Sequence, residues 1–363
     1  MEEENNNGTL MITLGRDAIG NDVSADILSW PHALVGGALN SGKTMFLHAL
    51  LNSLVTRYDA EHLRLVLAGA TGVDLGLYDH LPHMLTPAIA EPRKVVMVSK
   101  WLRKEMERRY EVLRDERVRD IDGYHRGVVD PAKAEAMRDP EKPLPEAMPY
   151  IVVVIDEVAD AMRAYGRELE AALVPVLQNG RAAGISIIIA TSSDDNKVIS
   201  AGMRPFLPAR VTLAAGSAQS QKFFLGMSWK ETVQGPRQAL YRAQAMEVPV
   251  RIEVPLVSSE MLEGLMSESR LHRADSERMD VPLRDGRGGF YSVHPDNDVE
   301  EEDDLYGEAK RAVIEMGKAS PSYLQRKLGV GYARAAKLMD LLEEGGVIGP
   351  ADGSKPRNVL ASE

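Results

Sequence analysis

Residues 37–44 have the sequence Gly37-Ala38-Leu39-Asn40-Ser41-Gly42-Lys43-Thr44, which matches the pattern G-x-x-x-x-G-K-[ST]. In this pattern the glycines let the backbone curl so that its N–H groups point at phosphate oxygens, and the following helix presents its positive N-terminus. The lysine contacts the β and γ phosphates, and the threonine hydroxyl ligates Mg²⁺. We therefore predict that these eight residues bind ATP with Mg²⁺.

The flanking sequence has the setting that this loop requires. Residues 32–36 form a short apolar run that ends in glycine, and residues 45–58 carry apolar side chains at helical spacing. A chance match to the motif is possible, but a chance match that also lies between a predicted strand and a predicted helix is much rarer. A glycine turn without a ligand is therefore the weaker interpretation.

Two acids follow a second apolar run. Residues 150–155 form a continuous run typical of a strand buried on both faces, and Asp156 and Glu157 come next. Asp156 is predicted to hold Mg²⁺ through water, and Glu157 to polarise the attacking water as general base. A strand that simply ends in surface acids is the alternative, and the phosphate loop makes it less attractive. Lys43, Asp156 and Glu157 are thus the predicted catalytic residues.

Strand-like and helix-like segments alternate along the first 266 residues. Further strands are predicted at residues 63–68, 185–191 and 210–214, and helices at residues 90–113 and 168–177. This alternation is typical of an α/β fold with a mostly parallel sheet and helices on both faces. Residues 114–148 have little periodicity and are predicted to form a loop or insertion.

The C-terminal 59 residues have a different pattern. Helical patterns at residues 305–316, 321–328 and 331–344 precede a Gly/Pro-containing stretch with apolar ends, which is typical of a small winged-helix domain. We therefore predict a disordered tail at 1–13, an α/β domain at 14–266, an acidic linker at 267–304 and a winged-helix domain at 305–363. Seven carboxylates and no basic residue lie within 296–304, which favours a solvated linker, with a site that competes with DNA as the alternative.

Composition excludes several classes of protein. The chain of 363 residues has no cysteine, so disulfides and cysteine metal sites are excluded. No apolar run reaches the roughly 18–20 residues that span a bilayer, and residues 1–8 lack the features of a signal peptide. We therefore expect a cytoplasmic protein without a membrane segment. A net charge of −11 argues against a surface covered with DNA-binding residues but allows a local basic patch.

With these residues in place, the chain resembles the FtsK/SpoIIIE DNA translocases from about Leu14 to Leu360. The order and combination of the matching segments are specific, although each one alone would be weak. Besides the phosphate loop and the acid pair, these segments are Leu14-Gly15-Arg16-Asp17, Tyr78 with Leu81-Pro82-His83-Met84-Leu85, Glu105-Met106-Glu107-Arg108-Arg109-Tyr110, Arg181-Ala182-Ala183-Gly184-Ile185, and residues 329–336.

The resemblance implies a RecA-like P-loop NTPase that works as a homo-oligomeric ring, usually a hexamer, around double-stranded DNA. ATP would lie between subunits, and an arginine of the neighbouring subunit would complete the site. Arg181 and Arg210 match arginines of the family pattern and are the candidates, with a core-facing or salt-bridging role as the alternative. Thr191 and Ser192 occupy the position of the family's γ-phosphate sensor.

Several positions depart from the family pattern. Ala68-Gly69-Ala70 stands where the family usually has D-P-K, and Thr191-Ser192-Ser193-Asp194 stands where it has T-Q-R-P. Ser192 thus replaces a glutamine, and Lys222 replaces an arginine. The phosphate loop and the acid pair are intact, so we expect ATP binding. The departures lie at positions that would affect fast translocation. A non-translocating DNA-binding regulator and an ATPase of a protein secretion system remain alternative functions.

DNA contacts are predicted in two places. A motor that moves any sequence must contact phosphates, and the loop at 194–204 offers Lys197 and Arg204. In the winged-helix domain, residues 331–342 would enter the major groove. Arg334 and Lys337 share a helix face at i and i+3, and Tyr332 belongs to the family pattern. A protein-interaction domain is the alternative there, and helix 100–117 is predicted to be a solvated outer face rather than a DNA surface.

Overall fold

The chain divides into two compact units, Met1–Val281 and Pro282–Glu363. In a computed structural model of the protein, the described part of the first unit comprises residues 10–69, 73–136, 144–235 and 237–258, with residues 261 and 264. The described part of the second unit comprises residues 283–284, 290–291, 306–316, 318–328, 338–339, 342–343, 347–349 and 357–359.

A nine-stranded sheet forms the first unit, with the order β2-β1-β9-β8-β7-β3-β6-β5-β4. The strands β7-β3-β6-β5-β4 are parallel, as predicted. The strands β8, β9, β1 and β2 extend the sheet in antiparallel fashion, which was not predicted. The strand bounds are β1 Met11–Arg16, β2 Asp22–Asp26, β3 His32–Gly36, β4 Leu63–Gly69, β5 Tyr150–Asp156, β6 Ile185–Thr191, β7 Ala209–Thr212, β8 Gln238–Arg242 and β9 Val250–Glu253.

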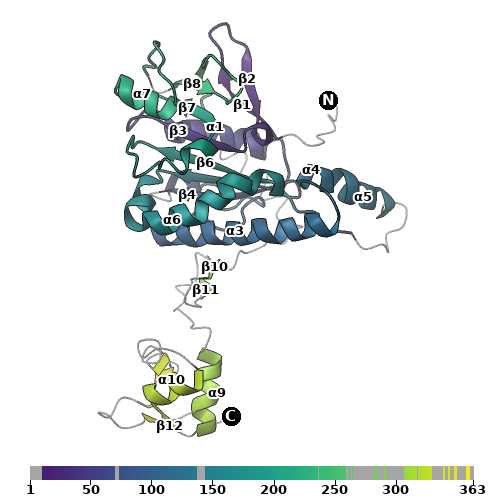
Figure 1. Ribbon diagram of the computed structural model, residues 1–363, viewed down its shortest axis with the longest axis vertical. Helices are drawn as coiled ribbons and strands as arrows, with labels where there is room; N and C mark the ends of the chain where they lie inside the picture. Colours follow the sequence, from purple (N-terminus) through teal and green to yellow (C-terminus); the bar gives the residue numbers. More distant parts are fainter. Residues whose placement is uncertain are drawn as a thin grey trace. The chain divides into compact units, whose positions relative to one another are not determined.

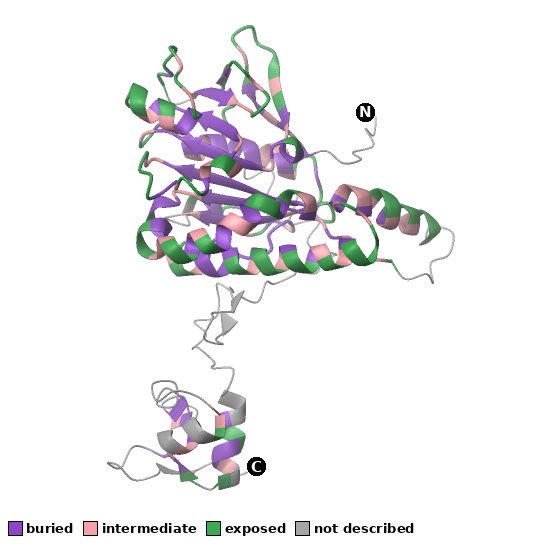
Figure 2. Cartoon of the chain, viewed as in Figure 1, coloured by how far each residue is buried: buried purple, intermediate pink, exposed green. Residues whose placement is uncertain are grey.

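Helices cover the sheet, and α3 and α6 lie side by side along one face (Figure 1). Each presents a buried stripe to the sheet and an exposed stripe outward (Figure 2), so α3 has the amphipathic pattern of a surface helix. The helices are η1 Ile27–Ser29, α1 Lys43–Val55, α2 Val73–Gly76, α3 Pro92–Asp115, α4 Ile121–Tyr124, the π-helix η2 His125–Val129, α5 Asp130–Ala136, α6 Ala159–Asn179, η3 Gly180–Ala183, η4 Arg204–Phe206 and α7 Ala218–Leu225.

The first strand begins earlier than the sequence indicated. Residues 11–13 belong to β1, so the predicted end of the disordered tail at residue 13 is wrong. Leu10, Ile12 and Leu14 alternate along the strand and are each at most 1% exposed, and the Leu10 N–H donates to a carboxylate oxygen of Asp26 at 2.9 Å. This apolar alternation buries one face of β1.

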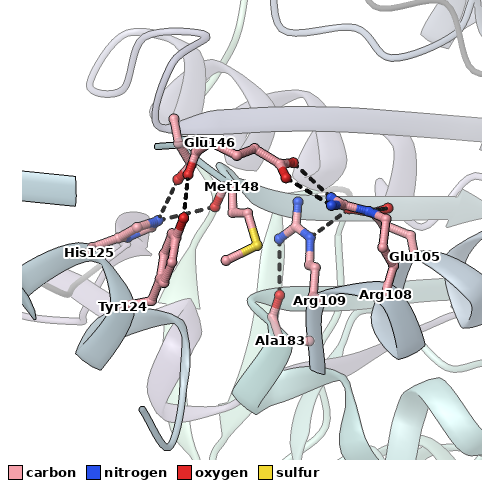
Figure 3. Close-up of polar contacts among 9 residues, drawn as sticks. Glu105, Arg108, Arg109, Tyr124, His125, Glu146, Met148 and Ala183 are labelled. Atoms are coloured by element: carbon pink, nitrogen blue, oxygen red, sulfur yellow. Dashed lines mark hydrogen bonds and ion pairs between the residues drawn. The ribbon is translucent and has the colours of Figure 1, made fainter. Parts of the chain in front are cut away.

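The segment predicted as a loop at 114–148 contains α4, η2 and α5, and the chain returns to the sheet through residues 144–149 (Figure 3). Side chains of α4 and η2 bind the returning backbone. The Tyr124 hydroxyl donates to the Glu146 carbonyl at 2.9 Å, and the His125 Nε2 lies 2.9 Å from the Ala147 carbonyl. Arg108 of α3 forms an ion pair with the Glu146 carboxylate at 2.7 Å.

Arg109 ties α3 to the start of β6 (Figure 3). Its side chain is 3% exposed, forms an ion pair with Glu105 at 2.8 Å, and donates to the Ala183 carbonyl at 2.9 Å. Burial lowers the pKa of Arg109, and the Glu105 carboxylate opposes this effect. The most buried arginine of the E-M-E-R-R-Y segment is therefore structural.

Removing the carboxylate partner of Arg109 is expected to destabilise the protein strongly. Glu105→Ala leaves a buried guanidinium without its counter-charge, which costs about 3–5 kcal/mol of unfolding free energy. Glu107→Ala is the matched control, because Glu107 forms an exposed pair with Arg103 on the same helix, and such pairs contribute about 0.2–1 kcal/mol. Urea unfolding followed by circular dichroism measures both, and equal losses would contradict the structural role.

The second unit contains α9 (Tyr306–Met316) and α10 (Pro321–Leu328), at the positions predicted for the first two helices. The strand β12 (Lys318–Ala319) pairs with β13 (Arg357–Asn358), and a small apolar core includes Val313, Leu324 and Leu342. Within the predicted linker, β10 (Leu283–Arg284) pairs with β11 (Phe290–Tyr291). The predicted DNA-reading residues Tyr332, Arg334 and Lys337 lie outside the described residues.

Candidate nucleotide site

The loop at 37–44 connects β3 to α1 in the predicted way. Helix α1 begins at Lys43, and Gly42 before it has φ +96°, a left-handed conformation that glycine adopts without strain. Asn40 is also left-handed, with φ +58°, and asparagine is among the few other residues that tolerate this region. The Ser41 hydroxyl is buried without a hydrogen-bond partner in the described part of the chain, so it is free to contact a phosphate.

Two glycines allow close packing where the strand enters the loop. A Cβ at Gly36 would lie 2.1 Å from the ring of Phe224, which α7 packs onto β3. A Cβ at Gly37 would lie 2.5 Å from the Ser41 hydroxyl. Side chains at either position would therefore displace α7 or open the loop.

The Lys43 ammonium lies inside the loop. Its Nζ donates to the carbonyls of Gly37 and Ala38, each at 3.0 Å, and the residue is 8% exposed. Burial lowers the pKa of Lys43, whereas the carboxylates of Glu157 and Asp156 raise it. The ammonium is thus held where the loop would surround a phosphate.

The predicted metal ligands come together at the same edge of the sheet. Asp156 ends β5, which β6 separates from β3, and its carboxylate oxygen lies 3.5 Å from the Thr44 hydroxyl. One carboxylate and one hydroxyl are oxygen ligands of the kind that Mg²⁺ prefers when phosphates complete its shell. The residues present therefore fit the predicted Mg²⁺.

Glu157 is held by the two predicted sensor residues. Its backbone is left-handed, with φ +49°, and one carboxylate oxygen accepts a hydrogen bond from the Thr191 hydroxyl at 2.9 Å. The other oxygen accepts from the Ser192 backbone N–H at 3.0 Å. Because Ser192 uses its main chain, the replacement of the family's glutamine by serine leaves this contact intact.

The charge on Asp156 is expected to reduce stability at neutral pH. Burial, and then the neighbouring Glu157, raise the pKa of Asp156. A carboxyl whose pKa rises on folding contributes stability below its unfolded pKa, about 3.9, and loses it as the pH rises through the folded value. Asp156→Asn should therefore increase the Tm at pH 7 in metal-free buffer, by about 2–4 °C for each kcal/mol gained.

Thermal unfolding at several pH values tests this prediction. The difference between Asp156→Asn and the parent should shrink as the pH falls towards about 4, where the parent carboxyl also becomes protonated. Asp160→Asn is the control, because Asp160 lies nearby and forms an exposed pair with Arg163. If Asp156→Asn had a lower Tm than the parent at pH 7, the predicted direction of the effect would be wrong.

The two candidate arginines lie in different places. Arg181 belongs to η3, which precedes β6, so it lies at the edge of the parallel sheet opposite the phosphate loop. It is exposed and lines a cavity with Asp26 and Asp120. The structure therefore does not bring Arg181 together with Lys43.

Arg210 lies on β7 beside β3, facing a cavity of about 530 Å³ that Arg204 and Lys222 also line. Its guanidinium is 8% exposed; Nη2 donates to the Arg204 carbonyl at 2.9 Å, and Nη1 has no partner within the described ranges. Burial, together with the charges of Arg204 and Arg242, lowers the pKa of Arg210 to about 10. A cluster of like charges around one buried guanidinium favours an anion.

Two members of this cluster were not predicted as part of it. Arg204 of the predicted DNA-contacting loop lies over the Phe223 ring at 4.4 Å and lines this cavity. Lys197 of the same loop is exposed, and its contact with DNA stays a prediction. Arg242 belongs to the cluster because it lies opposite Arg210 in the antiparallel register of β7 and β8. Nothing in the local sequence indicated that register.

Residues 1–205 match the FtsK/SpoIIIE family, and residues 300–362 match the Ftsk gamma domain. The chain belongs to the FtsK/SpoIIIE family. It is 34% identical over 359 residues to the DNA translocase FtsK of Bacillus anthracis, covering 98% of this chain and 43% of that protein. It is 36% identical over 359 residues to the DNA translocase FtsK of Corynebacterium glutamicum, covering 98% of this chain and 38% of that protein.

This FtsK/SpoIIIE chain thus spans less than half the length of those relatives. Solved structures with a similar fold include the pCW3 conjugation coupling protein TcpA with ATPγS, with a TM-score of 0.58, 20% identity, and coverage of 74% of this chain and 71% of that one. Another is the cytoplasmic domain of the type VII secretion ATPase EccC of Thermomonospora curvata, with a TM-score of 0.61 and 22% identity. The match covers 77% of this chain and 32% of that one. These likenesses confirm the predicted P-loop α/β fold.

No described helix is both long and apolar enough to cross a membrane.

Proposed function

We propose that this chain hydrolyses ATP and uses the energy to move double-stranded DNA, as a homo-oligomeric ring. The observation that carries the proposal is the convergence of Lys43, Thr44, Asp156 and Glu157 at one edge of the sheet. Relatives named DNA translocase FtsK match nearly the whole chain, and the C-terminal residues match the gamma domain.

Each residue has a role in phosphoryl transfer to water. Lys43 would contact the β and γ phosphates, while Thr44 and Asp156 would hold Mg²⁺, which neutralises charge on the phosphates when bound. Glu157 would accept the proton of the attacking water. Thr191 and Ser192 would orient Glu157 through the hydrogen bonds described above, as positioning residues.

The cavity at Arg210 is the better candidate for the contact with the neighbouring subunit. Its clustered guanidinium groups favour an anion, and the exposed Lys222 can reach outward from α7. The lining of the Arg210 cavity has one carboxylate, Asp194, beside three basic residues. The cavity at Arg181 has three carboxylates beside that single arginine, which disfavours a triphosphate. We therefore propose that Lys222 and Arg204 contact the nucleotide of the adjacent subunit, and that the buried Arg210 supports them.

Steady-state ATPase assays test this contact. Lys222→Ala should lower kcat by at least about tenfold, because charge supplied by an adjacent subunit stabilises the transition state. Lys230→Ala, an exposed lysine outside the cavity, is the control. If both variants hydrolyse ATP like the parent, the cavity has no role in catalysis.

The C-terminal domain is proposed to read DNA through Tyr332, Arg334 and Lys337. A bidentate contact from Arg334 to guanine would discriminate between bases by roughly 1–3 kcal/mol. In the full chain, Arg334→Ala should then reduce sequence preference while leaving ATP hydrolysis on non-specific duplex unchanged.

One experiment tests the function as a whole. ATP hydrolysis is measured with and without linear duplex DNA, and displacement of a triplex-forming strand then detects movement. We expect stimulation by duplex and ATP-dependent displacement. Hydrolysis that duplex does not stimulate would favour the secretion-type ATPase, whereas duplex binding without turnover would favour a non-translocating regulator.

A further inference from the structure

A second cavity lies next to the phosphate loop. It has a volume of about 370 Å³, within the range of small-molecule sites, and is lined by residues 214–218, Gln221 and residues 232–234. Hydrogen bonds join its wall to the loop: the Ala38 N–H donates to the Ala214 carbonyl at 2.7 Å, and the Leu213 N–H to the Gly36 carbonyl at 2.8 Å. The cavity is therefore fixed in position relative to the phosphate loop.

The order of strands gives a bound nucleotide a direction. Asp156 ends β5 and Glu157 follows it, on the side of β3 that β6 occupies, so the γ phosphate must point to that side. On the other side, β3 is bordered by β7, and residues 214–218 follow β7 directly. The nucleoside end of the triphosphate would leave the loop on the β7 side, where this cavity lies.

The lining suits a flat aromatic ring. Ala214, Ala215 and Ala218 carry only methyl groups, and Gly216 between them has φ +70°. Val233 is 6% exposed and packs in a small apolar cluster with Leu225 and Leu240. Ser217, Thr232 and Gln234 complete the lining beside Gln221. Apolar walls combined with a small number of polar groups are typical of small-molecule sites.

Gln221 supplies one oriented polar group. The residue is 5% exposed, and its amide nitrogen donates to the carbonyls of Trp229 at 3.3 Å and Glu231 at 2.8 Å. Both N–H donors are thereby used, so the amide can offer a ligand only its carbonyl oxygen. A carbonyl oxygen accepts a hydrogen bond from the 6-amino group of adenine and faces another acceptor in the 6-oxo group of guanine.

We propose that this cavity binds the adenine of the nucleotide and that Gln221 recognises its 6-amino group. The inference rests on the proposed ATP site, because the phosphate loop fixes where the base can lie. It assigns nucleotide selectivity to the segment that follows β7 and to α7, which lie apart from the catalytic residues.

Ligands that differ only at the base test the role of Gln221 without altering the protein. Binding of ATP, GTP and purine riboside triphosphate, which lacks the 6-amino group, is measured by calorimetry with Mg²⁺ and the Glu157→Gln chain, so that ATP is not consumed. We expect ATP to bind roughly tenfold more tightly than the other two, as for loss of one hydrogen bond in a buried site. Equal affinities would overturn the assignment.

A pocket-filling variant tests the cavity itself. Ala215→Leu should weaken ATP binding about tenfold and leave the affinity for tripolyphosphate within about twofold, since only the base is displaced. Unchanged tripolyphosphate binding also shows that the variant is folded. Ala201→Leu, an exposed alanine outside the cavity, is the matched control.

The outcomes separate this inference from the proposed function. If the parent binds tripolyphosphate and ATP equally, or Ala215→Leu leaves ATP binding unchanged, the base site is wrong while the phosphate site stands. If the parent binds neither compound, the phosphate site fails and the base site fails with it. If Ala215→Leu also loses its affinity for tripolyphosphate, Ala218→Leu is used as the test variant in its place. Unchanged ATP affinity in Ala218→Leu would overturn the assignment of the cavity to the base.

Discussion

Glu157→Gln is expected to reduce ATP hydrolysis by roughly 10²–10⁴-fold while ATP remains bound, because the general base is lost and the phosphate contacts are kept. Glutamine has the shape of glutamate and still offers one oxygen to the Thr191 hydroxyl, so the loop after β6 should keep its position. Its amide cannot take a proton from water at neutral pH. Phosphate release under saturating ATP measures the rate, and calorimetry with Mg²⁺ measures the affinity.

Asp160→Asn provides the control, since Asp160 lies three residues further on and pairs with the exposed Arg163. It makes the same change of charge without touching the site, and it should hydrolyse ATP like the parent. If Glu157→Gln retained full activity, another residue would have to accept the proton, and the proposed role of Thr191 and Ser192 in orienting the base would be lost as well.

The central strands and the phosphate site could be predicted because their signals are local. The runs before Gly37 and Asp156 are almost continuously apolar, as strands buried on both faces must be. Glycine, lysine and threonine at fixed spacing are what a phosphate and its metal require. In the structure, Thr44 and Asp156 then lie within 3.5 Å of each other although 112 residues separate them.

The antiparallel half of the sheet carries weaker signals. Its strand β8 has the sequence Gln-Ala-Leu-Tyr-Arg and is short, and β9 is shorter still, so neither shows a long apolar run or a clear period. Their register depends on pairing with β7 and β1, which are distant in sequence. Tertiary pairing thus decides these elements.

For the same reason, sequence could name Arg210 but not its surroundings. The cavity brings together residues from η4, β7 and α7. Only the folded chain shows that the charges of Arg204 and Arg242 act on Arg210. The base cavity is hidden in a similar way, because alanines at residues 214–218 carry no motif. These alanines become candidate binding residues only because the fold places them beside the phosphate loop.

Lys43→Ala is expected to weaken ATP binding by roughly 10²–10⁴-fold and to abolish measurable hydrolysis. The estimate follows from losing two charge-assisted contacts, each of about 1.5–3 kcal/mol, to the β and γ phosphates. The same ammonium also binds the carbonyls of Gly37 and Ala38, so alanine removes a restraint on the loop as well as a charge. Lys43→Gln separates the two effects, since its amide can still donate to a loop carbonyl but carries no charge.

Thermal shift with Mg²⁺-ATP measures these variants directly. A ligand that binds only the folded protein raises stability by RT ln(1 + [L]/Kd), so the parent should gain several degrees at saturating ATP and both Lys43 variants should gain little. Lys100→Ala, which removes an exposed lysine paired with Glu168, should respond like the parent. If Lys43→Gln kept the full shift, the loop carbonyl contacts rather than the positive charge would explain the need for lysine. If Lys43→Ala also kept it, nucleotide would have to bind elsewhere, and the motor would have no site at this edge of the sheet.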